Sequence, residues 1–162
     1  MADILLINSP IFRTNRDPDS GNSVPPIGLG YIYTQLKLAG YACQFVDAVL
    51  DNLLPDEIVN IINQSDAHFI GLNVFSSNFD IVDSIVENAS NSKTFLFGGP
   101  AIYYLLPEIK SWDINNDIIV ITGEAELAIP EIIKHPLKWG ESGGKIRIVH
   151  ITPESPFYPS NI

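Results

Sequence analysis

Cysteine is nearly missing from this chain of 162 residues, because Cys43 stands alone. A single cysteine excludes an intrachain disulfide, and it excludes a zinc or iron–sulfur site built from several cysteines of this chain. Basic residues are also few, with nine Lys and Arg against 19 Asp and Glu and a net charge of −10. The few basic residues are scattered, which argues against nucleic-acid binding through phosphate contacts.

Long hydrophobic runs are absent as well. No apolar run reaches the roughly 18 residues of a membrane span, so no membrane association is expected. The N-terminal stretch MADILLINSP has an acid at Asp3 and no basic segment, which is unlike a signal peptide. Hydrophobic residues make up 46% and charged residues 17% of the chain, a balance typical of a globular domain. We therefore expect one cytoplasmic domain with a short extra segment.

Strand and helix patterns alternate along the chain. Short apolar runs predict strands at 4–8, 42–46, 69–75, 94–97 and 118–121, and amphipathic patterns predict helices from Pro25–Pro26 to Gly40 and at 55–64, 79–89, 101–109 and 124–133. This alternation predicts an α/β, Rossmann-like (flavodoxin-like) fold: a doubly wound, five-stranded parallel sheet with helices on both faces. Residues 1–136 are expected to form this domain, and residues 137–162 an extra strand at 145–151 and a proline-rich linker or tail.

The residues that follow each strand are the candidate site, because ligands of such sheets bind at the carboxyl ends of the strands. The connection after the first strand is much longer than the usual 2–6 residues or so, which indicates a ligand at this edge. The residues at and after the strand ends are mostly polar or glycine: Asn8, Ser9, Asp47, Asn73, Phe75, Ser76, Ser77, Asn78, Gly98, Gly99, Pro100, Thr122, Gly123 and Glu124.

Residue types leave the roles of several of these positions open. Gly98 and Gly99 either let a bulky ligand approach the backbone or form a tight turn. Asp47 either binds a sugar hydroxyl or amide, or caps the next segment. Glu124 and Glu126 are expected in the first turn of a helix, where acids complement the helix dipole.

Other kinds of site fit poorly. The GLG of Gly28–Gly30 resembles a dinucleotide fingerprint, but its glycines lie inside a helix rather than directly after the first strand. Small residues there suit close packing on the sheet or on a planar ligand. No phosphate-binding P-loop and no Ser-His-Asp arrangement can be placed, and no catalytic or metal-ligating residue is expected. The histidines are expected in structural or surface positions: His68, His135 and His150.

Five stretches of the chain, in order, are ILLINSP, PPIGLGYIYTQLKLAGYACQFVDA, FIGLNVFSSN, FLFGGPAIYYLLPEI and DIIVITGEAELAIPEII. They resemble the N-terminal cobalamin-binding domain of B12-dependent radical S-adenosylmethionine enzymes. The resemblance covers roughly residues 3 to 134 and includes the Pro-Pro-hydrophobic-Gly helix opening, Asp-Ala after a strand, Gly-Gly-Pro, and a relative of Gly-Glu-Gly-Glu.

The resemblance implies that cobalamin lies on the carboxyl edge, bordered by the long loop after the first strand. The residues implied to hold it are Asn73, Phe75, Ser76, Ser77, Gly98, Gly99, Gly123 and Glu124, beside Ser9, Asp47 and Pro100 at the same edge. The implied enzyme transfers a methyl group. Its S-adenosylmethionine and 4Fe-4S cluster belong to a radical domain that is missing from this chain and acts in cis or in trans. The chain is then not catalytic alone.

The chain also departs from the family's pattern. The loop after the first strand lacks the cobalt-ligating histidine of methionine-synthase-type domains. Asn73, Ala101 and Ala125 stand where serine, histidine and glycine are common. These departures leave open a sensing or interaction domain that has lost cobalamin, and the fold alone leaves open a flavodoxin-like flavin-binding domain.

Overall fold

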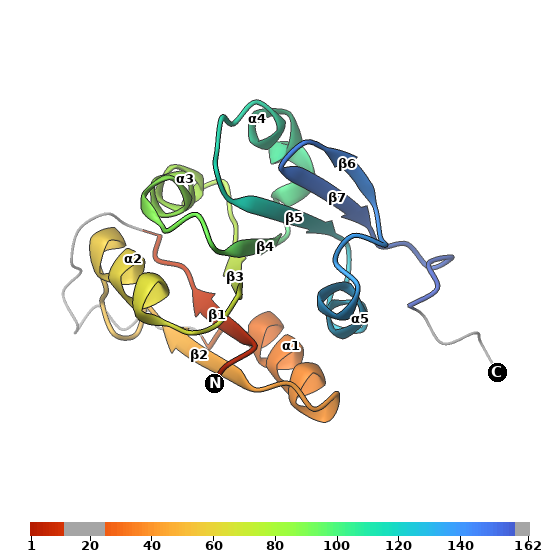
Figure 1. Cartoon of the computed structure of the whole chain (residues 1–162), viewed down its shortest axis with the longest axis horizontal. Coiled ribbons are helices and arrows are strands. Elements are labelled where there is room, and N and C mark those ends of the chain that lie inside the picture. Colours follow the sequence, from red (N-terminus) through yellow and green to blue (C-terminus); the bar gives the residue numbers. More distant parts are fainter. Residues whose placement is uncertain (12–24, 158–162) are drawn as a thin grey trace.

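A twisted sheet of seven strands organises the chain (Figure 1). The computed structural model describes residues 1–11 and 25–157. The strands of this part are β1 (Ile4–Asn8), β2 (Cys43–Asp47), β3 (Phe69–Asn73), β4 (Thr94–Gly98), β5 (Asp117–Thr122), β6 (Glu141–Gly143) and β7 (Ile146–His150). The helices are α1 (Ile27–Leu38), α2 (Pro55–Gln64), α3 (Phe79–Asn88), the 3-10 helix η2 (Ile102–Leu105), α4 (Leu106–Lys110) and α5 (Ile129–Lys134).

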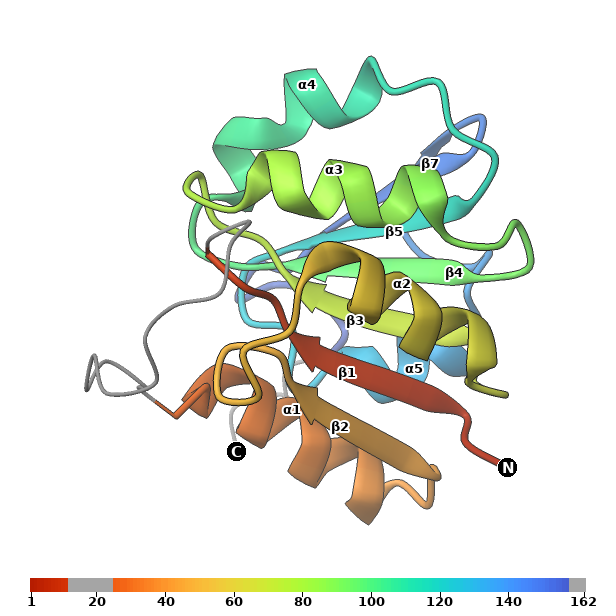
Figure 2. The same cartoon turned by 90° about the vertical axis from the view of Figure 1, so that its left-hand side faces the viewer.

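Two sandwiching layers of helices confirm the predicted α/β, Rossmann-like fold. Helices α2, α3 and α4 cover one face of the sheet, and α1 and α5 cover the other (Figure 2). Burial on both faces explains why the central strands are continuous apolar runs, as in β1, whose five residues are all buried.

The predicted number of strands was wrong, because the sheet has seven strands in the order β2-β1-β3-β4-β5-β7-β6. Strand β7 pairs in parallel with β5, and the short β6 pairs antiparallel with β7. The alternation of strands with helices ends after α5, so the sequence pattern did not show that the following hairpin returns to the sheet. Ile146 and Ile148 of β7 join the core on one face, and Val149 joins the core on the other.

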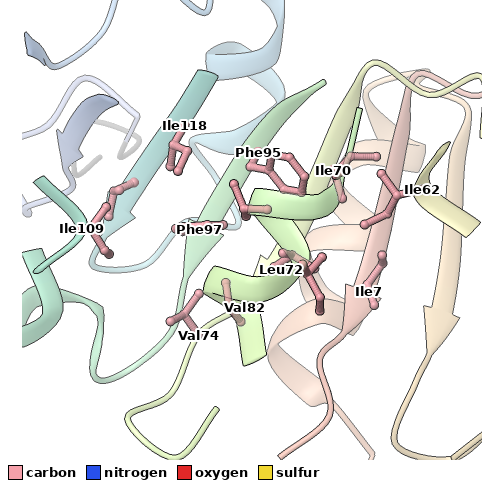
Figure 3. Packing of buried hydrophobic residues seen from close by; sticks show 14 of the residues in the cluster. Ile7, Ile62, Ile70, Leu72, Val74, Val82, Phe95, Phe97, Ile109 and Ile118 are labelled. Carbon is pink, nitrogen blue, oxygen red and sulfur yellow. The ribbon is translucent and has the colours of Figure 1, made fainter. Parts of the chain in front are cut away.

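The larger core lies between the sheet and helices α2, α3 and α4. Figure 3 shows Phe95 and Phe97 of β4 among the isoleucines, leucines and valines of neighbouring strands and helices. Both phenylalanines are fully buried, and the Phe97 ring meets Trp112 edge to face at 5.9 Å between centroids. The smaller core on the other face includes Leu36 of α1 and several residues of α5.

The strand order fixes where a ligand site can form. Order 2-1-3-4-5 reverses between β1 and β3, and open parallel sheets bind ligands at the carboxyl ends of strands near such a point. The carboxyl ends of β1 and β3 through β5 carry Asn8, Asn73, Gly98 and Thr122.

Helix α5 begins later than predicted. It starts at Ile129, with Pro130 in its first turn, where proline's missing N–H leaves no hydrogen bond unmade. The sequence predicted a helix from Glu124, so the placement of Glu124 and Glu126 in a first helical turn was wrong. Both glutamates instead lie in the loop that joins β5 to α5.

We propose that the folded unit extends through β7 rather than ending at residue 136. Ile148→Ala should lower the free energy of unfolding by about 2–5 kcal/mol, because it deletes buried methyl groups from the larger core. Leu137→Ala, at a side chain that is 81% exposed, should change it by less than about 0.5 kcal/mol. Urea unfolding of both variants measures the difference, and equal stabilities would place β7 outside the cooperative unit.

Candidate functional site

A pocket of about 370 Å³ lies at the carboxyl edge of the sheet, on the face covered by α1 and α5. Pockets for small ligands are on the order of 300–1,000 Å³ and mainly apolar, with a few polar groups. This one is lined by Leu6, Pro26, Ile27, Gly28, Leu29, Ile32, Gly71, Leu72, Asn73, Phe75, Leu96, Phe97, Gly98, Gly99, Pro100, Ile121, Gly123, Ala125, Glu126 and Ile129. Its walls are therefore aliphatic side chains and exposed glycine backbone.

Six of the sequence-predicted site residues meet in this pocket: Asn73, Phe75, Gly98, Gly99, Pro100 and Gly123. Five others lie outside its lining: Ser9, Asp47, Ser76, Ser77 and Glu124. Ser76 and Ser77 are exposed in the turn after β3, next to the pocket-lining Phe75. The two serines thus stand at the same edge, where they can meet a part of a ligand that projects from the pocket.

A chain of polar side chains connects the carboxyl ends of β2, β1 and β3. The Asn8 amide donates to Asp47 Oδ1 at 2.8 Å, and the Asn73 amide donates to Asn8 Oδ1 at 2.7 Å. Asn73 Oδ1 accepts from the backbone N–H of Ser9 at 2.6 Å. These bonds use the amide groups of both asparagines to hold the three strand ends together.

Asp47 acts as a cap in this structure. Its Oδ1 also accepts from the backbone N–H groups of Val49 and Leu50, at 3.2 and 3.1 Å. The capping role that the sequence left open is therefore present. The hydroxyl of Ser9, by contrast, is buried and has no hydrogen-bond partner among the described residues.

Two glycines of the pocket are required by the backbone itself. Gly99 has a φ of +140°, and a Cβ there would lie 2.2 Å from the carbonyl oxygen of Val74. Gly123 has a φ of +91°, and its Cβ would lie 2.4 Å from the carbonyl oxygen of Ile151. The tight-turn role therefore holds at Gly99, and it coexists with a place in the pocket wall.

Gly28 differs from these two glycines. It lies in α1, lines the pocket, and a Cβ added to it would meet no atom of the described residues within 4 Å. Packing among those residues does not require glycine there, and the missing side chain leaves the pocket open. The sequence pattern had associated small residues in this helix with close packing on the sheet or on a planar ligand, although it did not place Gly28 in a pocket.

The sequence prediction considered the residues that follow the strands, and so it missed the pocket residues contributed by the helices and by the loop before α5. They include Ile32 of α1, Ile129 of α5, and Ala125 and Glu126 of the loop before α5. Among the described lining residues, Glu126 is the one ionisable side chain. A carboxylate in this position favours ligand groups that donate hydrogen bonds and disfavours anions.

The described part of the chain offers few side chains that could bind a metal ion or act as a nucleophile. No group of three or more His, Cys, Asp or Glu side chains there could hold a metal ion. Burial raises the pKa of the Cys43 thiol to about 11, despite the opposing effect of Lys37, so the thiol stays protonated and is a poor nucleophile. The same residues include no helix that is long and apolar enough to span a bilayer.

Comparison with known families identifies the family of this domain. The B12 binding domain family matches residues 19–133, which is well over half of the chain. The chain therefore belongs to the B12 binding domain family, whose ligand is cobalamin. The match ends before β6 and β7. Neither the curated proteins nor the solved structures gave a significant match to the chain.

Gly99 and its neighbour Gly98 should respond differently to alanine. Gly99→Ala should lower the free energy of unfolding by about 1–3 kcal/mol or more. The alanine would have a strained φ, and its Cβ would clash with the carbonyl oxygen of Val74. Gly98→Ala should change it by less than about 1 kcal/mol, since the nearest atom to its Cβ would be 4.0 Å away. Urea unfolding without ligand provides the test, and equal losses would contradict the assigned backbone role.

Proposed function

We propose that the chain binds cobalamin with the base of the nucleotide tail in the apolar pocket and the corrin ring over the carboxyl edge of the sheet. The observation that carries this proposal is the free space at Gly28. A side chain would fit there among the described residues, and its absence keeps the pocket open. A flat benzimidazole base fits walls made of aliphatic groups and glycine backbone. The whole corrinoid is too large for about 370 Å³, so its ring has to lie outside.

The described residues offer complementary contacts for both parts of such a ligand. Leu29, Ile32 and Ile129 provide apolar surface against the base, at about 25 cal/mol per Å² of buried area. The exposed backbone of Gly99 and Gly123 and the hydroxyls of Ser76 and Ser77 stand at the edge, where the amide side chains of a corrin need hydrogen-bond partners. Glu126 can accept a hydrogen bond from a hydroxyl of the tail.

We further propose that the chain serves a B12-dependent radical S-adenosylmethionine enzyme that transfers methyl groups. The five ordered sequence stretches support this assignment. With Cys43 as its single cysteine, the chain cannot hold the iron–sulfur cluster, so the cluster and S-adenosylmethionine have to be bound by a radical domain in cis or in trans. Bound cobalamin supplies the methyl-carrying chemistry, and this chain binds and orients it.

Retention of cobalamin is the first test. The purified protein is incubated with hydroxocobalamin, desalted, and examined by visible absorption. About one corrin per chain supports the proposal. A colourless protein contradicts binding by this chain, and retained flavin from a parallel incubation with flavin mononucleotide would favour the flavodoxin-like alternative.

Gly28→Leu should distinguish binding of the nucleotide tail from binding of the corrin ring. Leucine fits the helical backbone but fills the pocket, so affinity for cobalamin should fall by roughly tenfold or more, about 1.4 kcal/mol. Affinity for cobinamide, which lacks the nucleotide tail, should not change. Titration of both corrinoids by absorption gives the two constants.

Gly30→Leu is the matched control for this experiment. Gly30 lies in the same helix, and its Cβ would also meet no atom of the described residues within 4 Å, but it lines a neighbouring hollow with Tyr33 and Phe45 instead of the main pocket. Both corrinoids should bind this variant like the wild type. Equal losses of cobalamin and cobinamide in Gly28→Leu would contradict a tail-binding pocket.

The radical enzyme context has its own test. Methyl transfer by this chain together with an iron–sulfur protein that cleaves S-adenosylmethionine would support it. Methyl transfer by the cobalamin-loaded chain without any iron–sulfur protein would contradict it.

A further inference from the structure

Strand β2 forms one open edge of the sheet, and β1 is the one strand that pairs with it among the described residues (Figure 2). Residues 42 and 48, which flank β2, have backbone hydrogen bonds to β1. Successive residues of a paired strand direct their backbone groups to opposite sides, so the N–H and C=O groups of Cys43 and Phe45 point away from β1. These groups therefore face the outside of the sheet.

The side chains of β2 do not protect this edge against another strand. Natural edge strands are commonly shielded by lysine, proline, a bulge or a very short length. Strand β2 has the sequence CQFVD, and the carboxylate of its one acid, Asp47, is bonded to Asn8 and to the turn that follows. The opposite edge differs, because β6 has three exposed residues and begins with Glu141. One edge of the sheet is thus open to strand pairing and the other is not.

A hollow lies beside β2 on each face of the sheet. The hollow on the α1 side has a volume of about 370 Å³, and its lining includes Gly30, Tyr33 and Phe45. The hollow on the α2 side has a volume of about 620 Å³, and its lining includes Gln44 and Val46. The Phe45 side chain is 39% exposed between them. A strand laid along β2 therefore has room for its side chains on both faces.

We propose that β2 of a second copy of the chain occupies this edge, paired antiparallel across a two-fold axis at Gln44. The carbonyl of Asp47 already accepts from the N–H of Asp51, so the free backbone groups belong to Cys43 and Phe45. An axis at Gln44 places Cys43 of each copy opposite Phe45 of the other. Each such pair exchanges two hydrogen bonds, so every outward-facing N–H and C=O of these two residues gains a partner.

The side chains favour a second copy over an unrelated strand. A two-fold axis that makes strands antiparallel is perpendicular to the sheet, so the two α1 helices lie on the same side of the joined sheet. Phe45 of one copy then contacts Cys43 of the other beside the hollow on the α1 side, and this is an apolar cross-strand pair. Helix α1 carries no acid and one cation, Lys37, although the chain has a net charge of −10. The matching surfaces are therefore free of opposed carboxylates, and each copy supplies what the other lacks.

Sedimentation velocity of the full chain over a wide range of concentration tests this proposal, which does not depend on cobalamin binding. We expect a reversible shift from monomer to dimer as the concentration rises. Phe45→Lys should raise the dimer Kd by roughly tenfold or more, because it removes the apolar pair and adds a positive charge from each copy near the axis. Tyr104→Lys makes the same change in charge at a 79% exposed aromatic side chain of η2, and it should leave the dimer Kd unchanged.

Two outcomes of this experiment would overturn the proposal. A wild-type chain that stays monomeric up to its highest soluble concentration does not use β2 to bind a second copy, and a strand from another protein would then be the occupant to seek. A dimer that is weakened equally by Phe45→Lys and Tyr104→Lys, or by neither, has its interface elsewhere.

A cysteine at the axis provides an independent test. Residue 44 of each copy would form a non-hydrogen-bonded antiparallel pair with Cα atoms about 4.5 Å apart, which lies within the range of disulfides. Gln44→Cys combined with Cys43→Ser should therefore form an intermolecular disulfide under mild oxidation. Ser142→Cys combined with Cys43→Ser puts the one cysteine on the opposite edge, in β6, and should remain monomeric. Equal cross-linking of the two variants, or no cross-linking of Gln44→Cys, would contradict pairing of β2 with itself.

Discussion

The hydrogen-bonded chain from Asp47 through Asn8 to Asn73 is the constraint on which the binding edge depends. It joins the ends of three strands at the point where the strand order reverses. Polar groups committed to this network have little capacity left for a ligand. Recognition therefore falls to apolar walls and glycine backbone on the α1 and α5 side, together with the exposed groups of the edge.

This division explains what the sequence could and could not predict. Alternating apolar runs report which segments are strands or helices, and α2 has the predicted bounds of Pro55–Gln64. The parallel direction of the strands likewise brings their carboxyl ends to one edge, so the sequence could predict that Asn73, Gly98 and Gly123 lie at this edge. Periodicity does not report which helix lies over which strand. Pocket residues contributed by helices, such as Ile32 and Ile129, therefore need the three-dimensional structure.

Two further limits have local causes. Strand β7 follows a turn-like stretch and proline-rich sequence lies beyond it. An extra strand was therefore expected at 145–151, but composition did not show that it joins the main sheet, where Ile146 and Ile148 are core residues. The start of α5 depends on Pro130, which suits a first turn but does not forbid an earlier start. The shorter helix leaves Glu126 in a loop that faces the pocket. A small shift in a helix boundary thus changed the expected role of a charged residue.

Gly28 and Gly99 illustrate two different reasons for glycine at one site. Gly99 is fixed by its φ and by the Val74 carbonyl, so the fold alone accounts for it. At Gly28 the backbone is helical and space is open, and glycine in a helix costs roughly 0.5–1 kcal/mol relative to alanine. Gly30 of the same helix has the same free space, so what distinguishes Gly28 is its place in the pocket wall. In the proposed complex the flat base of the tail occupies the volume of the missing side chain, so each added carbon at position 28 would remove contact surface for the base.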